Sequence, residues 1–433
     1  MKLGKKMFVT TACSLSLVGL FACSSTDTTT PSTDSPSINP DASPDAQLLT
    51  FWMPEGGVAE NELYAKLESD FNSENTEIQI ELITIPRGNG YEYENKINSA
   101  ATTQDLPDAI MMDGPSVANY VHAGLITPIG QYFSTDELSD FVPSTIQQGT
   151  VNGELYALAP TESTVGLYCN ADVFEAAGIS IPDKLEDAWT WEEVYEIAKT
   201  LQTDEMFGIN LTWDDGEGQI YGLSPIVLSN GVQLLDDTGT IANGYINSPE
   251  AVEALTLYQK FATEGIMNLQ ALTDEFANGG AAMFLMGSWE YSNLVNNFPD
   301  FNFEITYYPT TNADVGVVSP AGDWAWGITS QSSNPEAAAE VMKYLTSAET
   351  VEAYTHAAQK PASRSSVLEN QDMHPIFADQ VNQTSMARPI STSYPMLSQE
   401  FSTAMQNIRT GADVQSSLDT VAERFETDIA RNQ

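Results

Sequence analysis

The chain has few cysteines, few histidines and few positive charges, and each shortage argues against a class of protein. Its 433 residues include three Cys and three His. Three cysteines cannot form a disulfide framework, and the spacing of His122, His356 and His374 is not that of metal ligands. Lys and Arg number 16 against 60 Asp and Glu, a formal net charge of −44. This charge argues against nucleic acid and anionic lipid as binding partners.

The sequence also lacks long apolar segments and the common catalytic motifs. No segment beyond the N-terminal region is apolar enough over sufficient length to cross a bilayer. The GxSxG, HExxH and P-loop patterns are absent, and residues 87–90 (RGNG) are not a dinucleotide fingerprint. Among 60 carboxylates many pairs resemble the acid–base couple of a glycosidase, but nothing singles one out. We therefore expect a protein without enzymatic activity, metal or cofactor, and keep a secreted carbohydrate-cleaving enzyme as the alternative.

The N-terminus has the pattern of an exported lipoprotein. Three lysines within the first six residues precede a short apolar run from Met7 to Ala22, and Cys23 follows. A basic start, a short apolar run and a small residue are typical of a secretory signal peptide. A cysteine directly after that small residue resembles the bacterial lipobox, which implies cleavage after residue 22 and lipid on Cys23. We expect an extracytoplasmic protein, anchored to the outer face of the cell membrane or periplasmic. The alternative is an ordinary signal peptide with an incidental cysteine.

A polar segment follows Cys23. Residues 24–46 consist almost entirely of Ser, Thr, Pro, Asp and Ala. Such a segment buries too little apolar surface to offset its conformational entropy, so we expect residues 23–46 to form a disordered tether.

The remaining chain is too long for one ordinary core, which favours two domains. Loss of the signal peptide leaves 13 Lys and Arg against 60 acids, a net charge near −47. Because these acids are scattered, we interpret them as a solvated surface suited to salty surroundings rather than as a device for cation selectivity.

The hydrophobic pattern predicts an α/β fold. Leu63, Leu67 and Phe71 recur at helical spacing, and residues 91–101 form a second predicted helix. The intervening strands alternate with these helices, which indicates a parallel sheet covered on both faces. The predicted strands are residues 48–52, 78–82, 109–112 and 281–286.

Several helix starts are also marked. Thr190 and Glu193 form a capping box, and Ser248 precedes a proline at a first helical position. Asn334, before Pro335, has the same arrangement. Another helix is expected after residue 288. Cys169, between a predicted strand and a turn, is expected to be a buried structural thiol.

Aromatic, acidic and amide residues follow the predicted strands. Because ligands bind at the carboxyl ends of strands in such sheets, we expect these residues to line a cleft. Indole rings beside carboxylates suit a sugar, whose apolar face packs on the ring and whose hydroxyls donate to the acids. The same residues could instead surround the ammonium group of a cationic ligand. For any single tryptophan, packing in the core is the alternative. The candidates are Trp52, Glu55, Asn89, Asp113, Trp289, Gly322, Asp323 and Trp324.

Several segments, in order and spacing, match one family. They are residues 153–160 (GELYALAP), 166–178 (GLYCNADVFEAAG), 189–193 (WTWEE), 281–289 (AAMFLMGSW) and 360–364 (KPASR). With them the chain resembles the extracellular solute-binding proteins of ABC importers, in the sugar- and oligosaccharide-binding group that includes maltose-binding protein. Cys169 departs from the family, which more often has an aromatic residue there.

The resemblance implies a two-lobed, type II periplasmic-binding-protein fold with hinge crossings and a ligand cleft between the lobes. The crossings are expected near residues 160–164, 303–308 and 346–350. Lobe 1 is then expected to take residues 47–161 and 305–345, and lobe 2 residues 162–304 and 346–433.

The resemblance also implies a function and a set of ligand contacts. It implies a monomer that captures a sugar and delivers it to ABC permease subunits without altering it. A cationic ligand such as a polyamine, and an accessory role for a membrane sensor, are alternatives on the same fold. Asn89 is a candidate from its strand-end position alone. The contacts carried over from the family are Trp52, Glu55, Asp113, Glu162, Trp289, Gly322, Asp323, Trp324 and Arg364, and for Arg364 a role that only ties segments together is the alternative.

Overall fold

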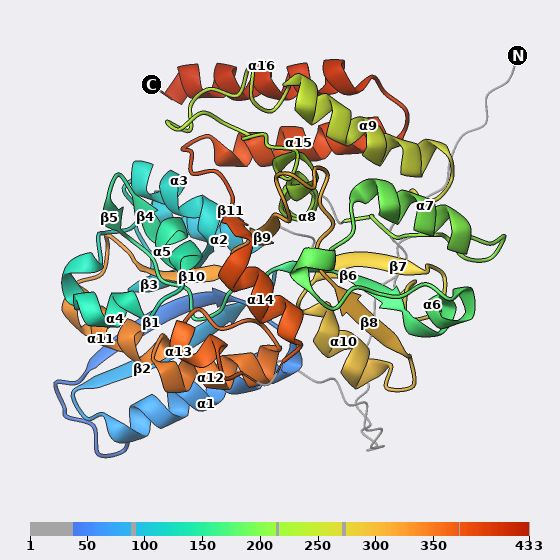
Figure 1. Ribbon diagram of the computed structural model, residues 1–433. Coiled ribbons are helices and arrows are strands. Elements are labelled where there is room, and N and C mark those ends of the chain that lie inside the picture. The colour runs from blue at the N-terminus through green and yellow to red at the C-terminus, as the bar shows by residue number, and fades with distance from the viewer. Residues whose placement is uncertain (1–37, 88–91, 214–215, 271–273, 372, 433) are drawn as a thin grey trace, which may run out of the picture. The chain divides into compact units, whose positions relative to one another are not determined.

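The computed structural model describes residues 38–87, 92–213, 216–270, 274–371 and 373–432, all within one compact unit, Ser37–Gln433. The predicted signal peptide, Cys23 and Asn89 lie outside the described residues. Helices and strands follow one another along the chain (Figure 1). In order they are β1 (Gln47–Pro54), α1 (Val58–Glu74), β2 (Ile78–Ile85), α2 (Glu92–Thr103), β3 (Ala109–Asp113), η1 (Gly114–Ser116), α3 (Val117–His122), η2 (Gly130–Tyr132), α4 (Thr135–Ser139), α5 (Pro143–Gly149), β4 (Thr150–Val151), β5 (Glu154–Leu155), β6 (Val165–Asn170), α6 (Ala171–Ala177), η3 (Leu185–Asp187), α7 (Trp191–Leu201), α8 (Glu217–Leu228), α9 (Pro249–Thr263), β7 (Met283–Gly287), α10 (Glu290–Asn297), β8 (Phe303–Thr306), β9 (Ser319–Ala321), β10 (Trp324–Ile328), α11 (Pro335–Leu345), α12 (Ala348–Ala358), α13 (Ser365–Leu368), α14 (Pro375–Gln383), β11 (Ser385–Ala387), α15 (Tyr394–Arg409) and α16 (Val414–Asn432).

The first sheet has the strand order β10-β3-β1-β2. β1 runs parallel to β2 and β3, as predicted, whereas β10 is antiparallel to β3. Leu49, Phe51 and Met53 alternate along β1 and face α1, α11 and α12, while Trp52 faces the opposite side, where α2 and α3 pack. Side chains of successive strand residues point to opposite faces, so both faces of this sheet are covered. We call the packed residues around it the first core.

The second sheet has the order β7-β6-β8, and both of its strand pairs are antiparallel. The prediction of an all-parallel arrangement is wrong here. Strand–helix alternation indicates parallel pairing for strands joined by one crossover, but more than a hundred residues separate β6 from β7. Cys169 on β6 is fully buried, as predicted. The largest set of packed residues surrounds this sheet, with contributions from α7, α8, α9, α15 and α16, and we call it the second core.

The helix starts follow the sequence signals at two of the three predicted sites. Thr190 and Glu193 exchange the two hydrogen bonds of a capping box at the start of α7, and Ser248 accepts from the Ala251 amide at the start of α9. Asn334 makes no side-chain cap at α11, although Pro335 occupies the first turn as expected. An asparagine before a proline is therefore not sufficient for a side-chain cap.

The chain passes between the two cores later than predicted at its second and third crossings. β8 pairs with β6, and Tyr308 is still in the second core, so residues 303–308 are not a crossing. The passage runs instead through β9. α12 packs on α1 and its Tyr354 belongs to the first core, so residues 346–350 are not a crossing either. The expected positions of these crossings came from the family resemblance and not from a pattern in this chain's own sequence.

The expected tether is too long at its C-terminal end. The Asn39 side chain donates to the carbonyls of Ser73 and Asn75, and its amide donates to Gln79 Oε1 at 2.7 Å. The Ser43 amide donates to the Thr76 carbonyl. Polar hydrogen bonds therefore hold residues 39–43 against the start of β2, although the segment has little apolar surface to bury.

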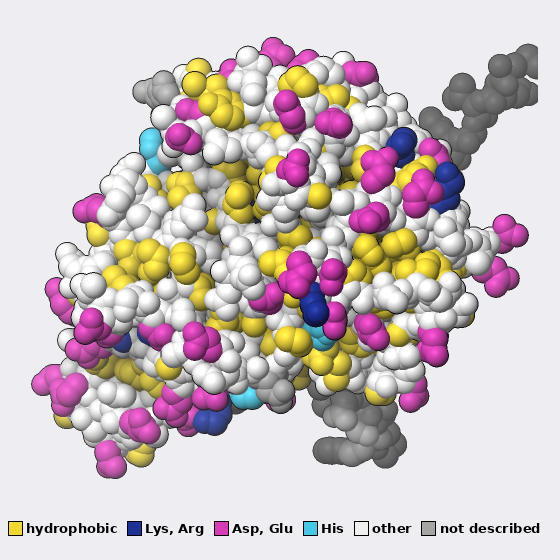
Figure 2. All heavy atoms as spheres, viewed as in Figure 1, with side chains coloured by type: hydrophobic (Ala, Val, Ile, Leu, Met, Phe, Trp, Pro, Cys, Tyr) yellow, Lys and Arg dark blue, Asp and Glu magenta, His cyan; other side chains and the backbone are white. Residues whose placement is uncertain are grey.

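Acidic side chains are spread over the visible face in Figure 2, with few Lys or Arg among them. This distribution matches the interpretation of the negative charge as a solvated surface. Among the helices of the described segments, none combines the length and apolarity that crossing a membrane requires.

Candidate ligand-binding site

A cavity of about 100 Å³ lies at the carboxyl ends of the first sheet. Glu55 follows β1, Arg87 follows β2 and Trp324 begins β10, so three loops of the sheet meet there. Glu55, Asp323 and Trp324 are thus brought together at one cavity. The lining residues are Pro54, Glu55, Gly56, Glu60, Tyr64, Arg87, Met111, Pro160, Thr161, Asp323, Trp324, Tyr354 and Lys360.

Asp323 is held by donors from three directions in the wall of this cavity. Thr161 Oγ1 donates to Asp323 Oδ2 at 2.5 Å, the Trp324 amide donates to Oδ1 at 2.9 Å, and Lys360 Nζ lies 3.4 Å from Oδ2. Lys360 also lies 3.5 Å from a carboxylate oxygen of Glu60. Burial raises the pKa of Asp323 against the opposing effect of Lys360. Burial alone would lower the pKa of Lys360, but Asp323 and Glu60 raise it, so the lysine stays charged.

A positively charged side chain lies over the indole ring of Trp52 and another over that of Trp324. Lys96 Nζ lies 4.6 Å from the centroid of the Trp52 ring, and Arg87 Cζ lies 5.0 Å from that of Trp324. Each contact has the geometry of a cation–π interaction. The role of these two rings in packing on a sugar stays a prediction.

Glu162 is fully buried where the chain first passes between the two cores. Its carboxylate accepts from Ser144 Oγ at 3.1 Å, from Thr145 Oγ1, and from the Gly322 amide at 3.1 Å. Within the described ranges it forms no ion pair. Burial raises its pKa to about 7, and the three donors offset part of that effect.

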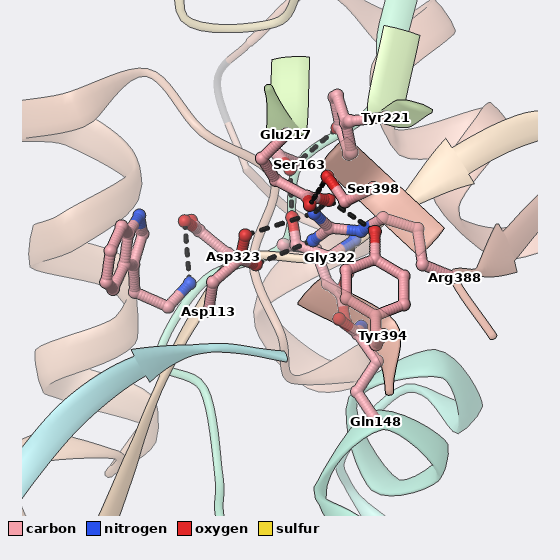
Figure 3. A network of polar contacts seen from close by, with 12 residues as sticks. Asp113, Gln148, Ser163, Glu217, Tyr221, Gly322, Asp323, Arg388, Tyr394 and Ser398 are labelled. Atoms are coloured by element: carbon pink, nitrogen blue, oxygen red, sulfur yellow. Dashed lines mark hydrogen bonds and ion pairs between the residues drawn. The ribbon is translucent and has the colours of Figure 1, made fainter. Parts of the chain in front are cut away.

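Asp113 ends β3 and faces a guanidinium (Figure 3). Arg388 Nη1 and Nη2 donate to its two oxygens at 3.0 and 2.6 Å, a bidentate pair. The same Nη1 donates to Glu217 at the start of α8. Glu217 also accepts from the hydroxyls of Ser398 and Tyr394 on α15. Burial raises the pKa of Glu217, and Arg388 opposes that effect.

Trp289 packs with two other aromatic rings, and we call the three rings of Trp213, Tyr221 and Trp289 the aromatic shelf. Its ring centroid is 6.0 Å from that of Tyr221 at an interplanar angle of 32°, and 6.3 Å from that of Trp213 with the rings edge to face. Trp289 remains 37% exposed, unlike the buried Trp213. A supported ring with an accessible surface is what stacking on a sugar requires.

Gly322 is the point where several of these groups converge. Its φ of 142° is rarely adopted by other residues. A Cβ at this position would lie 2.7 Å from both Arg388 Nη2 and Gln148 Oε1. Glycine is therefore required for the close approach of these side chains to the backbone.

Arg364 lies apart from these groups. Its Nε donates to the Thr346 carbonyl, Nη1 lies 3.1 Å from Asp140 Oδ2, and its guanidinium covers the Phe141 ring at 4.1 Å. These contacts tie segments together, which is the alternative to the ligand contact carried over from the family.

Sequence reasoning missed Arg388, Glu217 and Tyr221, and gave Lys360 no role. The one available signal is the small number of Lys and Arg residues in the chain. Two of these few cations, Arg388 and Lys360, form buried ion pairs. Within the described ranges, no cluster of His, Cys, Asp and Glu has the arrangement of a metal site.

Comparison with known proteins identifies similar chains. The family model of bacterial extracellular solute-binding proteins matches residues 55–352. The multiple sugar-binding protein of Streptococcus mutans is 20% identical over 327 residues, which are 71% of this chain and 73% of that protein. The maltodextrin-binding protein MdxE of Bacillus subtilis is 26% identical over 365 residues, which are 79% of this chain and 77% of that protein.

Among solved structures, the cyclic alpha-maltosyl-1,6-maltose binding protein from Arthrobacter globiformis matches with a TM-score of 0.77 and 20% identity, covering 89% of this chain and 100% of that one. Maltose-bound MalE3 of T. maritima matches with a TM-score of 0.74 and 22% identity, covering 88% and 100%. These structures confirm the two-lobed, type II fold that the sequence predicted. Because the family model matches more than half of its length, the chain belongs to the bacterial extracellular solute-binding protein family.

Proposed function

We propose that this protein captures a sugar or oligosaccharide outside the cytoplasmic membrane and delivers it, unaltered, to the permease of an ABC importer. The observation that carries the proposal is the partly exposed ring of Trp289, supported by Tyr221 and Trp213 and linked through Arg388 to the carboxylate of Asp113. The names of the similar proteins, which bind sugars, support the same ligand class.

The ligand would lie between the two cores. Trp289 would pack on the apolar face of a pyranose, and Glu55, exposed at the cavity, would accept hydrogen bonds from its hydroxyls. Trp52, Trp324, Asp113, Asp323, Glu162 and Asn89 remain candidate contacts from the sequence. Binding would shift an open–closed equilibrium because the ligand touches both cores when the lobes are closed.

The proposal includes the lipid anchor on Cys23 predicted from the sequence. The anchor would keep the protein at the membrane where the permease is located. The lobes are proposed to follow the two cores, with crossings near residues 160–164, through β9, and between α12 and α14.

Isothermal titration calorimetry with a panel of mono- and oligosaccharides tests this function. We expect one or more sugars to bind, and Trp289→Ala to weaken the best ligand at least about tenfold because a stacked ring contributes on the order of 1 kcal/mol beyond its buried area. Tyr245→Ala, which removes a half-buried ring in the turn before α9, is the control and should leave affinity unchanged. The absence of binding heat for every sugar, or product formed from an oligosaccharide, would contradict the proposal.

A further inference from the structure

Arg388 forms bonds to both cores. It follows β11, which pairs with β9 where the chain passes between the cores. Toward the first core, its two terminal nitrogens donate hydrogen bonds to both carboxylate oxygens of Asp113 at the end of β3. Its side chain is 5% exposed. The contact is therefore a buried, two-point attachment to the first sheet.

Toward the second core, Arg388 is held by α8. Nη1 donates to Glu217, which is itself fixed by the hydroxyls of Tyr394 and Ser398 from α15. The face of the guanidinium lies over the Tyr221 ring, 5.0 Å from its centroid. Figure 3 shows the carboxylates of Asp113 and Glu217 and the ring of Tyr221 gathered around this one side chain.

The ring that Arg388 covers is the support of the proposed stacking surface. Tyr221 packs against Trp289 at an interplanar angle of 32°. One guanidinium thus joins the carboxylate expected to bind sugar hydroxyls to the ring expected to stack on the sugar. No other Lys or Arg in the described part of the chain forms ion pairs with acids of both cores.

The chemistry of the contact requires arginine. A planar guanidinium binds a carboxylate through two parallel hydrogen bonds and stacks on a ring at the same time, whereas an ammonium group offers one point charge. A buried ion pair also contributes little net stability after desolvation, and its best-attested role is to fix one arrangement of the surrounding elements. The Arg388 network has the form of such a fixing device.

We propose that Arg388 is a positioning residue that holds Asp113 of the first core in register with the Tyr221–Trp289 shelf of the second core, so that the two halves of the sugar site act together. This inference rests on the proposed function. It assigns to Arg388 an effect that is transmitted through Asp113 and the shelf.

The test measures the affinity of the best sugar for Arg388→Gln and Arg388→Lys. We expect Arg388→Gln to weaken binding about ten- to a hundredfold, with an intermediate loss for Arg388→Lys because it restores the charge but neither the bidentate contact nor the stacking. Asp140→Asn is the matched control. It removes one partner of an Asp–Arg contact of similar burial that lies away from the site, and it should leave affinity unchanged.

A double-mutant cycle with Asp113→Asn separates positioning from a structural effect. If Arg388 acts through Asp113, Arg388→Gln should have a much smaller effect on sugar affinity in the Asp113→Asn background than in the wild type. Additive losses, or wild-type affinity in Arg388→Lys and Arg388→Gln, would overturn the inference. If Arg388→Gln fails to fold, the same cycle is run with Arg388→Lys. A wild-type protein that binds no sugar would overturn the proposed function instead, so the two failures are distinguishable.

Discussion

The buried carboxylate of Glu162 makes the stability of this protein depend on pH. It is fully buried, has hydroxyl and amide donors, and has no ion-pair partner among the described residues. Burial raises its pKa from 4.5 to about 7. The folded state therefore binds this proton more tightly than the unfolded state does. The perturbation that isolates the group is Glu162→Gln, which removes the titration and keeps the shape.

The sign and size follow from linkage. A group whose pKa is raised by folding contributes stability that is fully present below about pH 4.5 and is lost as the pH rises to about 7. A shift of roughly 2.5 pKa units corresponds to about 3 kcal/mol of unfolding free energy. The difference in stability between wild type and Glu162→Gln should therefore change by about 3 kcal/mol between pH 4.5 and pH 8, with the wild type favoured at the acidic end.

Urea unfolding of the ligand-free protein at a series of pH values and fixed ionic strength measures this difference. Comparison with the variant is essential because burial also raises the pKa values of Glu94, Glu275 and Glu290. Glu137→Gln is the control, since capping contacts with Ser134 lower the pKa of Glu137 to about 2, below the tested window. Parallel stability curves for wild type and Glu162→Gln would refute the reasoning.

Two further predictions concern the shelf and the anchor. Gly287→Ala should weaken sugar binding several-fold, because a Cβ there would lie 2.3 Å from the Trp289 ring and displace it, whereas Gly130→Ala, whose Cβ would meet Leu155 at 3.5 Å, should bind normally in the same calorimetric assay. Cys23→Ser should move the protein from the membrane fraction to the soluble fraction and abolish incorporation of labelled fatty acid. Unchanged membrane association would refute the anchor.

Local sequence signals predicted the elements of the fold better than their partners. Leu49, Phe51 and Met53 alternate on β1 because one face of the strand packs on helices, and that pattern is visible in the sequence. The antiparallel pairing of β6 with β7 and β8 depends on contacts between segments far apart in the chain. Tyr308 packs in the second core and Tyr354 in the first, whereas the lobe bounds carried over from the family place each of them in the other lobe. Periodicity shows that a face is buried but does not identify the partner.

The candidate site likewise contains residues that local sequence patterns indicate and residues that only contacts distant in the chain bring in. Glu55 and Asp113 were predictable as candidates because they follow the predicted strands 48–52 and 109–112, which belong to one sheet, whereas Asp323 and Trp324 follow none of the predicted strands. Arg388 was not predictable, since it follows the three-residue strand β11 and reaches the site through pairing with β9. No sequence motif marks Arg388. The one indication is that the chain has few cations, and Arg388 is one of the few that form a buried ion pair.

The hydrogen bonds already made within the site indicate how its acids contribute to binding. Asp113, Glu162 and Asp323 each accept at least two hydrogen bonds from the protein, which holds their positions and occupies part of their acceptor capacity. A sugar hydroxyl that binds to one of them either uses a remaining lone pair or replaces a protein donor, and replacement yields little net free energy because one hydrogen bond is exchanged for another. The ring of Trp289, by contrast, exchanges contact with water for contact with the ligand. The stacking surface should therefore supply affinity, while the positioned carboxylates discriminate among hydroxyl arrangements, since a ligand that leaves a buried acceptor unpaired loses more than it would gain from a matched bond.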